Sequence, residues 1–349
     1  MDARVWDLSV VLESVLELQM AQFSPTLIHA FHAYRTGPIA TRLARGIEAP
    51  LLVTMTGTDA NRDIFAPDAG PTVRRVLDSA AAITVFHDSI AAKVAAAVPD
   101  LAPRLVVIPQ SVGFEDAIGP SSPAGAIRRA PGPVLLFPAG IRKVKQPRFP
   151  VEPLERLRPR FPTLELLYVG PVIEADEGDG LFRLLRSRPW ARYVGILAHD
   201  RMPGLLRHAD VILNCSLSEG GMANSVLEAL AMGRAVLAAD IEGNRSVIED
   251  GVTGFLFSTA EEFAAKAARL LVDPALRERL GDAGREFVRA HLPPTREVEG
   301  YLAVYRRVVP TLSWGAGADL PPAPAIPRRE FSSPLDGSVQ GPCFPRRMP

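Results

Sequence analysis

Cysteine is nearly absent from this chain, because only Cys215 and Cys343 occur in 349 residues. One lies in an apolar stretch and the other near the end of the sequence, so they do not indicate a disulfide framework and are typical of a reducing cytoplasm. An excess of either charge is also missing, since 39 Lys and Arg residues balance 39 Asp and Glu residues. A neutral chain gives no support for a nucleic-acid partner.

Long apolar runs are missing as well. None approaches the roughly 20 residues that cross a bilayer, and the N-terminus lacks the basic and then apolar pattern of a secretory signal. These absences leave peripheral membrane contact open. The chain is 47% hydrophobic and 22% charged, which is the composition of a globular protein, and its 349 residues suffice for two domains. We therefore expect a cytoplasmic protein of two domains.

Short apolar runs alternate with amphipathic stretches along the whole sequence. In the first part we expect a helix over residues 6–20 and strands over residues 26–31, 51–55, 82–86 and 105–108. In the second part we expect strands over residues 133–137, 164–169, 193–197, 211–215, 235–238 and 254–257. Strands separated by helices at this spacing predict α/β domains with parallel sheets.

Composition divides the chain into five parts. Residues 1–122 are expected to form the first domain, residues 123–132 a linker, and residues 133–295 the second domain. Residues 296–309 read as a last helix. Residues 310–349 are punctuated by Pro and Gly, contain few Leu and Val, and show no period, which predicts a disordered tail.

The loop at residues 218–228, Ser-Glu-Gly-Gly-Met-Ala-Asn-Ser-Val-Leu-Glu, is central to the functional prediction. It joins the expected strand at residues 211–215 to a helix expected over residues 226–232. Its small residues leave backbone N–H groups accessible, and the positive end of the following helix favours an anion. In an open α/β sheet, ligands bind at the carboxyl ends of strands, where this loop would lie. The loop therefore predicts a site for an anionic ligand.

The two glutamates of this loop have different interpretations. Glu219 is expected to accept hydrogen bonds from sugar hydroxyls, with a solvated loop carboxylate as the alternative. Glu228 follows Ser225 by three residues, so a capping box is an equally good interpretation of Glu228. A capping glutamate keeps a second oxygen for a ligand, so both roles of Glu228 remain open.

These motifs resemble the donor half of family 4 retaining glycosyltransferases, and particularly the glycosyltransferase 1 domain-containing proteins. The likeness rests on residues 218–233, 235–238 and 251–257, and on Gly-x-Arg-x-Val-Lys-x-Pro at residues 140–147. The resemblance implies a GT-B fold, with two Rossmann-like domains, a cleft between them, and a last helix that crosses back to the first domain. It also implies transfer of a sugar from a nucleotide sugar to an unknown acceptor with retained configuration. No cofactor is implied, and the lack of any Asp-x-Asp triplet fits a metal-independent enzyme.

The resemblance also assigns roles to individual residues. Arg142 and Lys145 would neutralise the donor diphosphate, whose departing group gains negative charge in the transition state; a solvated basic loop is the alternative. Glu228 would hold the ribose, and Glu219 would orient the sugar. The catalytic set is therefore Glu219, Arg142 and Lys145. The donor-binding set is Gly140, Arg142, Lys145, Gly195, Gly220, Gly221, Met222, Ala223, Asn224 and Glu228.

Candidate acceptor-binding residues follow two strands of the first domain. Tyr34 and Arg35 come after one strand, and Thr58 and Asp59 come after the next. Similar segments face the cleft between the domains in the resembled family. The alternative, which cap propensity favours, is that Thr58 or Asp59 caps the following helix.

The sequence departs from the family pattern in three places. Eight residues rather than seven separate Glu219 from Glu228, and Thr56 stands where many family 4 enzymes carry His. A leading strand, glycine-rich turn and helix are missing, so we expect a shortened acceptor domain or a truncated start. A catalytically impaired nucleotide-sugar-binding or scaffold protein is the alternative function. A phosphorylase of the same fold is less favoured, because no lysine segment for a pyridoxal cofactor stands out.

Overall fold

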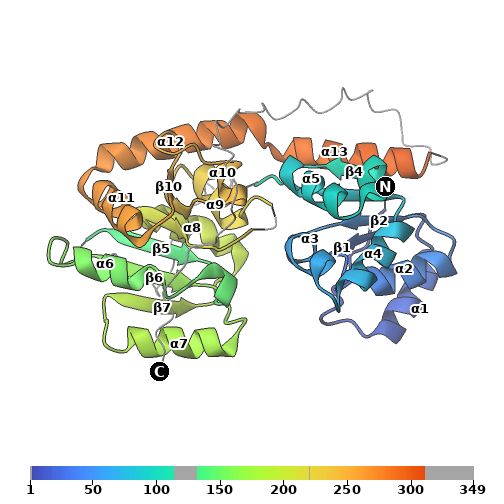
Figure 1. Ribbon diagram of the computed structural model, residues 1–349, viewed down its shortest axis with the longest axis horizontal. Helices are drawn as coiled ribbons and strands as arrows, with labels where there is room; N and C mark the ends of the chain where they lie inside the picture. The colour runs from blue at the N-terminus through green and yellow to red at the C-terminus, as the bar shows by residue number, and fades with distance from the viewer. Residues whose placement is uncertain (1, 114–131, 220, 311–349) are drawn as a thin grey trace.

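The computed structural model describes residues 2–113, 132–219 and 221–310. They form two α/β domains that lie side by side, each built on a parallel sheet (Figure 1). The predicted linker, apart from residue 132, and the predicted tail, apart from residue 310, lie outside the described residues, as does Cys343.

The first domain is built on a four-stranded sheet with the order β1-β2-β3-β4. Its strands are β1 (Ile28–Phe31), β2 (Leu51–Thr54), β3 (Ala82–Val85) and β4 (Leu105–Val107). Its helices are α1 (Glu13–Phe23), α2 (Gly37–Gly46), α3 (Thr58–Asn61), α4 (Gly70–Ser79) and α5 (Asp88–Ala97), with short 3-10 turns η1 (Asp63–Phe65) and η2 (Pro99–Arg104). The strand predictions are confirmed, because apolar runs that are buried on both faces are typical of a parallel sheet.

Helices cover both faces of this first sheet. Alternate strand residues such as Val53 and Ile83 pack with α2, α4 and α5 on one side. On the other side, Leu52 packs with Val304 of α13 (Pro294–Val308). The last described helix therefore lies against the first domain, as Figure 1 shows.

The second domain is built on a six-stranded sheet with the order β10-β9-β8-β5-β6-β7. Its strands are β5 (Val134–Pro138), β6 (Glu165–Val169), β7 (Ala191–Gly195), β8 (Val211–Asn214), β9 (Ala235–Ala239) and β10 (Phe255–Phe257). Strands β6 and β7 follow on one side of β5, and strands β8, β9 and β10 follow on its other side. The strand order therefore reverses between β5 and β8, and such a switch point is where ligands bind in open α/β sheets.

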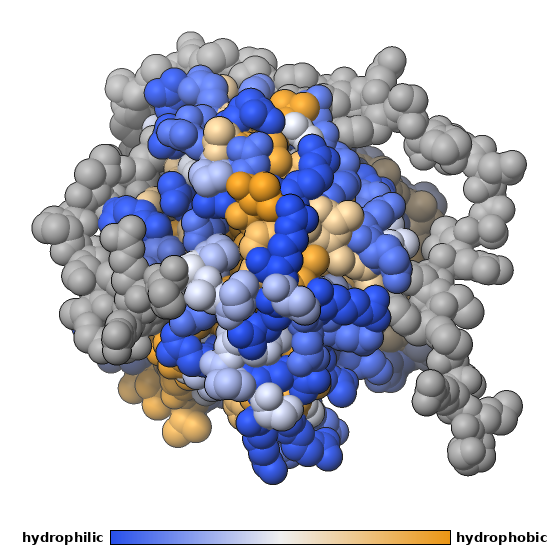
Figure 2. All heavy atoms as spheres, turned by 90° about the vertical axis from the view of Figure 1, so that its left-hand side faces the viewer, coloured by the Kyte–Doolittle hydropathy of each residue, from blue (hydrophilic) through white to orange (hydrophobic). Residues whose placement is uncertain are grey.

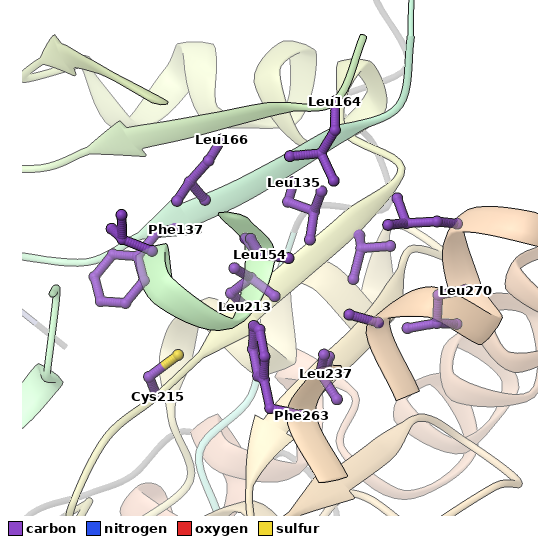
Figure 3. Packing of buried hydrophobic residues seen from close by; sticks show 14 of the residues in the cluster. Leu135, Phe137, Leu154, Leu164, Leu166, Leu213, Cys215, Leu237, Phe263 and Leu270 are labelled. Carbon is purple, nitrogen blue, oxygen red and sulfur yellow. The ribbon is translucent and has the colours of Figure 1, made fainter. Parts of the chain in front are cut away.

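Two hydrophobic layers enclose this second sheet. Leu135 and Phe137 of β5 point into one layer, shown in Figure 3, while Val134 and Leu136 point into the other, as the two-residue period of a strand requires. The surrounding helices are α6 (Val151–Leu157), α7 (Ala175–Leu185), α8 (Met202–His208), α9 (Asn224–Ala231), α10 (Glu242–Arg245), α11 (Ala260–Val272) and α12 (Pro274–His291).

Several elements begin or end one or more residues away from their predicted bounds, and two of these differences have a clear local cause. The first helix begins at Glu13 rather than residue 6, because Asp7 accepts hydrogen bonds from Ser9 and holds a turn there. Strand β7 ends at Gly195 rather than residue 197, since Gly195 takes a φ of 98° that extended strands do not adopt.

The outer end of the second domain carries mainly hydrophilic side chains, interrupted by smaller hydrophobic areas (Figure 2). No helix in the described part of the chain combines the length and apolar character that a membrane span needs. The hydrophobic layers lie inside the two domains, and the functional groups must be sought in the loops at the ends of the strands.

Candidate donor site

Two loops meet at the switch point of the second sheet. Strand β5 leads into the basic turn that contains η3 (Lys143–Lys145), and β8 leads into the loop that contains Glu219. The backbone N–H of Leu217 donates to the carbonyl of Val144 over 2.8 Å and joins the two loops. The sheet order thus brings together two motifs that lie about seventy residues apart in the sequence.

Glu219 is the most heavily bonded side chain of this site. Its Oε1 accepts hydrogen bonds from Lys145 Nζ at 2.5 Å, Ser216 Oγ at 2.7 Å and Asn214 Nδ2 at 3.2 Å. Asn214 is held in turn, because its Oδ1 accepts from the backbone N–H of Ser216 and from Asn244 Nδ2 of α10. The side chains of Lys145 and Glu219 are only 12% and 11% exposed. The carboxylate therefore has a fixed position.

This arrangement leaves binding capacity on both members of the ion pair. Within the described residues, Oε2 of Glu219 takes part in no hydrogen bond, so it can accept from ligand hydroxyls. Lys145 donates one bond to Glu219 and has two further N–H groups for an anion. The pair can therefore present a cation and an acceptor to one ligand.

Arg142 lies three residues before Lys145 and precedes η3. Its Nε is buried and has no hydrogen-bond partner in the part of the chain that the structure describes. A buried polar group without a partner costs free energy, and a guanidinium gains most from a bidentate anion such as a phosphate. Arg142 is therefore suited to an anionic ligand that the protein itself does not supply.

The side chains of Met222 and Ala223 point away from this site, whereas the prediction for this loop concerned its backbone N–H groups. They are 4% and 3% exposed and pack into the hydrophobic layer beneath α9. The apolar character of both side chains explains their burial, so only their backbone can face a ligand. Gly221 is buried, and Asn224 is exposed at the start of α9. Gly220 lies outside the described residues.

The capping-box interpretation of Glu228 is wrong. Helix α9 begins at Asn224, so Ala223 occupies the N-cap and Ser225 lies within the first turn. Glu228 is 14% exposed and its Oε1 is hydrogen-bonded to Nε2 of His199 at 3.1 Å. Burial raises the pKa of the Glu228 carboxyl above its ordinary value, while the hydrogen bond with His199 opposes that rise. The carboxylate is thus largely shielded from solvent.

Two other predicted glycines, Gly140 and Gly195, have different surroundings. A Cβ on Gly140 would lie 2.5 Å from Cδ1 of Ile173, so a larger residue there would require the exposed Ile173 side chain to move. A Cβ on Gly195, by contrast, would have no described atom within 4 Å beyond its chain neighbours. Exposed apolar side chains lie near the carboxyl ends of β6 and β7, with Val172 40%, Ile173 56% and Ile196 74% exposed. They offer apolar surface beside the open side of Gly195.

Asp59 is a structural carboxylate rather than an exposed acceptor ligand. It is wholly buried, and its Oδ1 accepts from the backbone N–H groups of Thr56, Gly57 and Ala60. Its Oδ2 accepts from the N–H of Ala33 at 2.7 Å, which ties the loop after β1 to the loop after β2. Gly57, not Thr58 or Asp59, occupies the N-cap of α3. The prediction that the Asp59 side chain faces an acceptor is therefore wrong.

The other residues predicted to lie on the acceptor side are accessible to solvent. Tyr34 is 41% exposed, Arg35 is exposed, and Thr58 is half-buried. The preceding His32 adopts a left-handed φ of 84°, which is strained for a residue with a Cβ. Its Nδ1 accepts from the N–H groups of Tyr34 and Arg35, each at 3.3 Å, and so fixes the turn that carries them.

Asn214, Ser216 and His199 are site residues that the motifs did not predict. A signal for two of them was present, because a polar residue that ends a buried strand points to a site at the carboxyl edge of a sheet. His199 lies in η4 (His199–Arg201), and nothing local to its sequence relates it to Glu228. No group of three or more His, Cys, Asp or Glu side chains among the described residues could hold a metal ion.

Comparison with known proteins agrees with this architecture. Residues 132–273 match the family model described as glycosyl transferases group 1. Glycosyltransferase 1 domain-containing protein 1 of Xenopus tropicalis is 25% identical over 293 residues, which cover 82% of this chain and 83% of the relative.

Solved structures match both domains together. HepE of Anabaena, in complex with UDP-glucose, has a TM-score of 0.70 at 17% identity and covers 83% of this chain and 82% of its own. Sucrose-phosphate synthase of Thermosynechococcus elongatus has a TM-score of 0.66 at 19% identity, over 86% of this chain and 78% of its own. The chain therefore has the GT-B fold, and its residues 132–273 are similar to the glycosyl transferases group 1 family.

Proposed function

We propose that this chain transfers a sugar from a nucleotide-sugar donor to an acceptor, with retention of the anomeric configuration and without a metal ion. The observation that carries the proposal is the cluster at the switch point, where Lys145, Asn214 and Ser216 hold one oxygen of Glu219 and leave the other available. A sugar diphosphate has both of the groups that such a cluster recognises, a strong anion and several hydroxyls.

The predicted donor residues with charged side chains have roles that their surroundings support. Lys145 would bind the diphosphate together with Arg142, whose buried Nε has no partner among the described residues, and Oε2 of Glu219 would accept from sugar hydroxyls. Glu228 would accept from the ribose, because it is part-buried and keeps one oxygen beyond its contact with His199. The apolar surface around Ile196 would pack against the nucleotide base.

The proposed sugar transfer depends on stabilising the negative charge that develops on the leaving diphosphate. The bond between the anomeric carbon and the diphosphate oxygen breaks, and the acceptor oxygen bonds to the same face of that carbon. The diphosphate leaves with the electron pair, and a diphosphate oxygen takes the proton of the acceptor hydroxyl. Arg142 and Lys145 lower the barrier, because fixed cations stabilise charge that grows in the transition state. Attack on the same face is inferred from the family resemblance.

The test is to incubate the purified chain with a panel of UDP- and GDP-sugars, with and without candidate acceptors. UDP-sugars come first, because HepE was solved with UDP-glucose. We expect release of the nucleoside diphosphate, no change in turnover with a metal chelator, and retained configuration of the product by NMR. Arg142→Ala is expected to lose most of this turnover. Binding without turnover would instead indicate the alternative, a nucleotide-sugar-binding protein that has lost catalysis.

A further inference from the structure

The first domain contacts the loop between β8 and α9, residues 215–223, which we call the donor loop, on both sides of residue 220. Asn61, the last residue of α3, donates from Nδ2 to the main-chain carbonyl of Glu219 over 2.9 Å. Phe86, which follows β3, packs against Gly221 so closely that a Cβ there would lie 2.8 Å from the Phe86 Cβ. Both contacts are made to the backbone of the loop, so they can fix its path whatever the side chains of the loop do.

The Asn61 side chain is itself held in place. Its Oδ1 accepts from Lys93 Nζ of α5 at 2.5 Å, and the same ammonium lies 3.6 Å from Oε2 of Glu242 in α10. Because Oδ1 is the acceptor for Lys93, the amide must turn its Nδ2 donor toward Glu219. Lys93 thus fixes the orientation of Asn61 and forms an ion pair with the second domain.

The opposite side of the donor loop is closed by the second domain. A Cβ on Gly243 would lie 2.2 Å from the carbonyl oxygen of Gly221 and 2.8 Å from the Cβ of Glu219. The loop backbone therefore lies between Gly243 on its own domain and Asn61 and Phe86 on the other. A substitution of Asn61 or Phe86 in the first domain can therefore shift Glu219 through direct contacts with its loop.

We propose that Asn61 is a positioning residue that couples the first domain to the donor loop and holds Glu219 in the place where it meets the sugar. This inference rests on the proposed function for its catalytic meaning. The Asn61 hydrogen bond reaches the main-chain carbonyl of Glu219, whereas Lys145 is bonded to the Glu219 side chain and Arg142 lies on the other loop. Asn61 should therefore act mainly on the sugar and on turnover rather than on binding of the nucleoside diphosphate.

Two variants of Asn61 and one control separate this role from simple loss of structure. Asn61→Ala removes both bonds, Asn61→Asp keeps an acceptor for Lys93 but loses the donor to Glu219, and Glu242→Gln weakens only the ion pair with Lys93. We expect both Asn61 variants to lower UDP-sugar turnover about 5- to 10-fold, the effect of one net hydrogen bond, with the dissociation constant for UDP changed by no more than about 2-fold. Glu242→Gln should change neither by more than about 2-fold.

Hydrogen exchange provides a readout that does not depend on turnover. We expect amide exchange in the donor-loop peptide to rise by about 5-fold in both Asn61 variants and to stay unchanged in Glu242→Gln. Unchanged exchange in Asn61→Ala would overturn the coupling, even if the wild type transfers no sugar. Faster exchange combined with an inactive wild type would support the coupling and contradict only the proposed function. A loss of UDP affinity as large as the loss of turnover would also overturn the proposal.

Discussion

Two carboxylates lie beyond the carboxyl ends of strands, one in each domain, and they differ in what their oxygens bind. In the first domain, Asp59 is wholly buried and both of its oxygens accept hydrogen bonds from the backbone. In the second domain, only Oε1 of Glu219 is bonded within the described residues, and its partners are side chains. The comparison shows that position at a strand end does not identify a ligand-binding carboxylate. An oxygen without a partner among the described residues is what makes Glu219, and not Asp59, the candidate for ligand binding.

The largest expected effect is on the structural carboxylate. Asp59→Ala leaves buried N–H groups without an acceptor, including those of Gly57 and Ala33, and we expect the free energy of unfolding to fall by about 3 kcal/mol or more in urea denaturation. Asp59→Asn should cost less, because its one carbonyl oxygen can still accept. Unchanged stability together with a weaker affinity for the acceptor would give Asp59 the ligand-binding role instead.

The next effect concerns a buried histidine of the first domain. His29 is hydrogen-bonded to Tyr305 of α13 and to Thr54, and burial lowers the pKa of its imidazole from 6.5 to about 4. Between pH 4 and pH 6.5, His29 is protonated more readily in the unfolded chain than in the folded protein. The free energy of unfolding therefore decreases as the pH falls from 6.5 toward 4. The loss should reach roughly 3 kcal/mol. The difference in unfolding free energy between wild type and His29→Gln should shrink over this pH range. A constant difference would show that the proton is not linked to folding.

A smaller and more selective effect is expected at the basic turn. Lys145→Ala should weaken binding of UDP by about 1–3 kcal/mol, because it loses a charge-assisted hydrogen bond. Lys143→Ala is the matched control, since that side chain is exposed on the same turn and should leave affinity nearly unchanged. Equal affinities of wild type and Lys145→Ala for UDP by calorimetry would show that Lys145 does not bind the diphosphate.

The fold was largely predictable from the sequence, because buried parallel strands form continuous apolar runs between helices. Residues 133–137, for instance, predict a strand that the structure places at Val134–Pro138. Lys145 and the donor loop were predictable as separate motifs, and only the order of the sheet explains why they meet. The interdomain bond from Asn61 to Glu219 depends on how two domains dock, which no local pattern encodes. Helix starts were less certain, and the N-cap at Ala223 rather than Ser225 is one example.

The central claim is that Glu219 meets the sugar while neighbouring cations hold the diphosphate. The most direct measurement compares wild type and Glu219→Gln in UDP-sugar turnover and in calorimetric affinity for UDP. We expect turnover to fall about 100-fold or more, because an acceptor fixed for the transition state is lost, and the affinity for UDP to change by less than about 3-fold. Equal turnover in the two proteins would contradict the account.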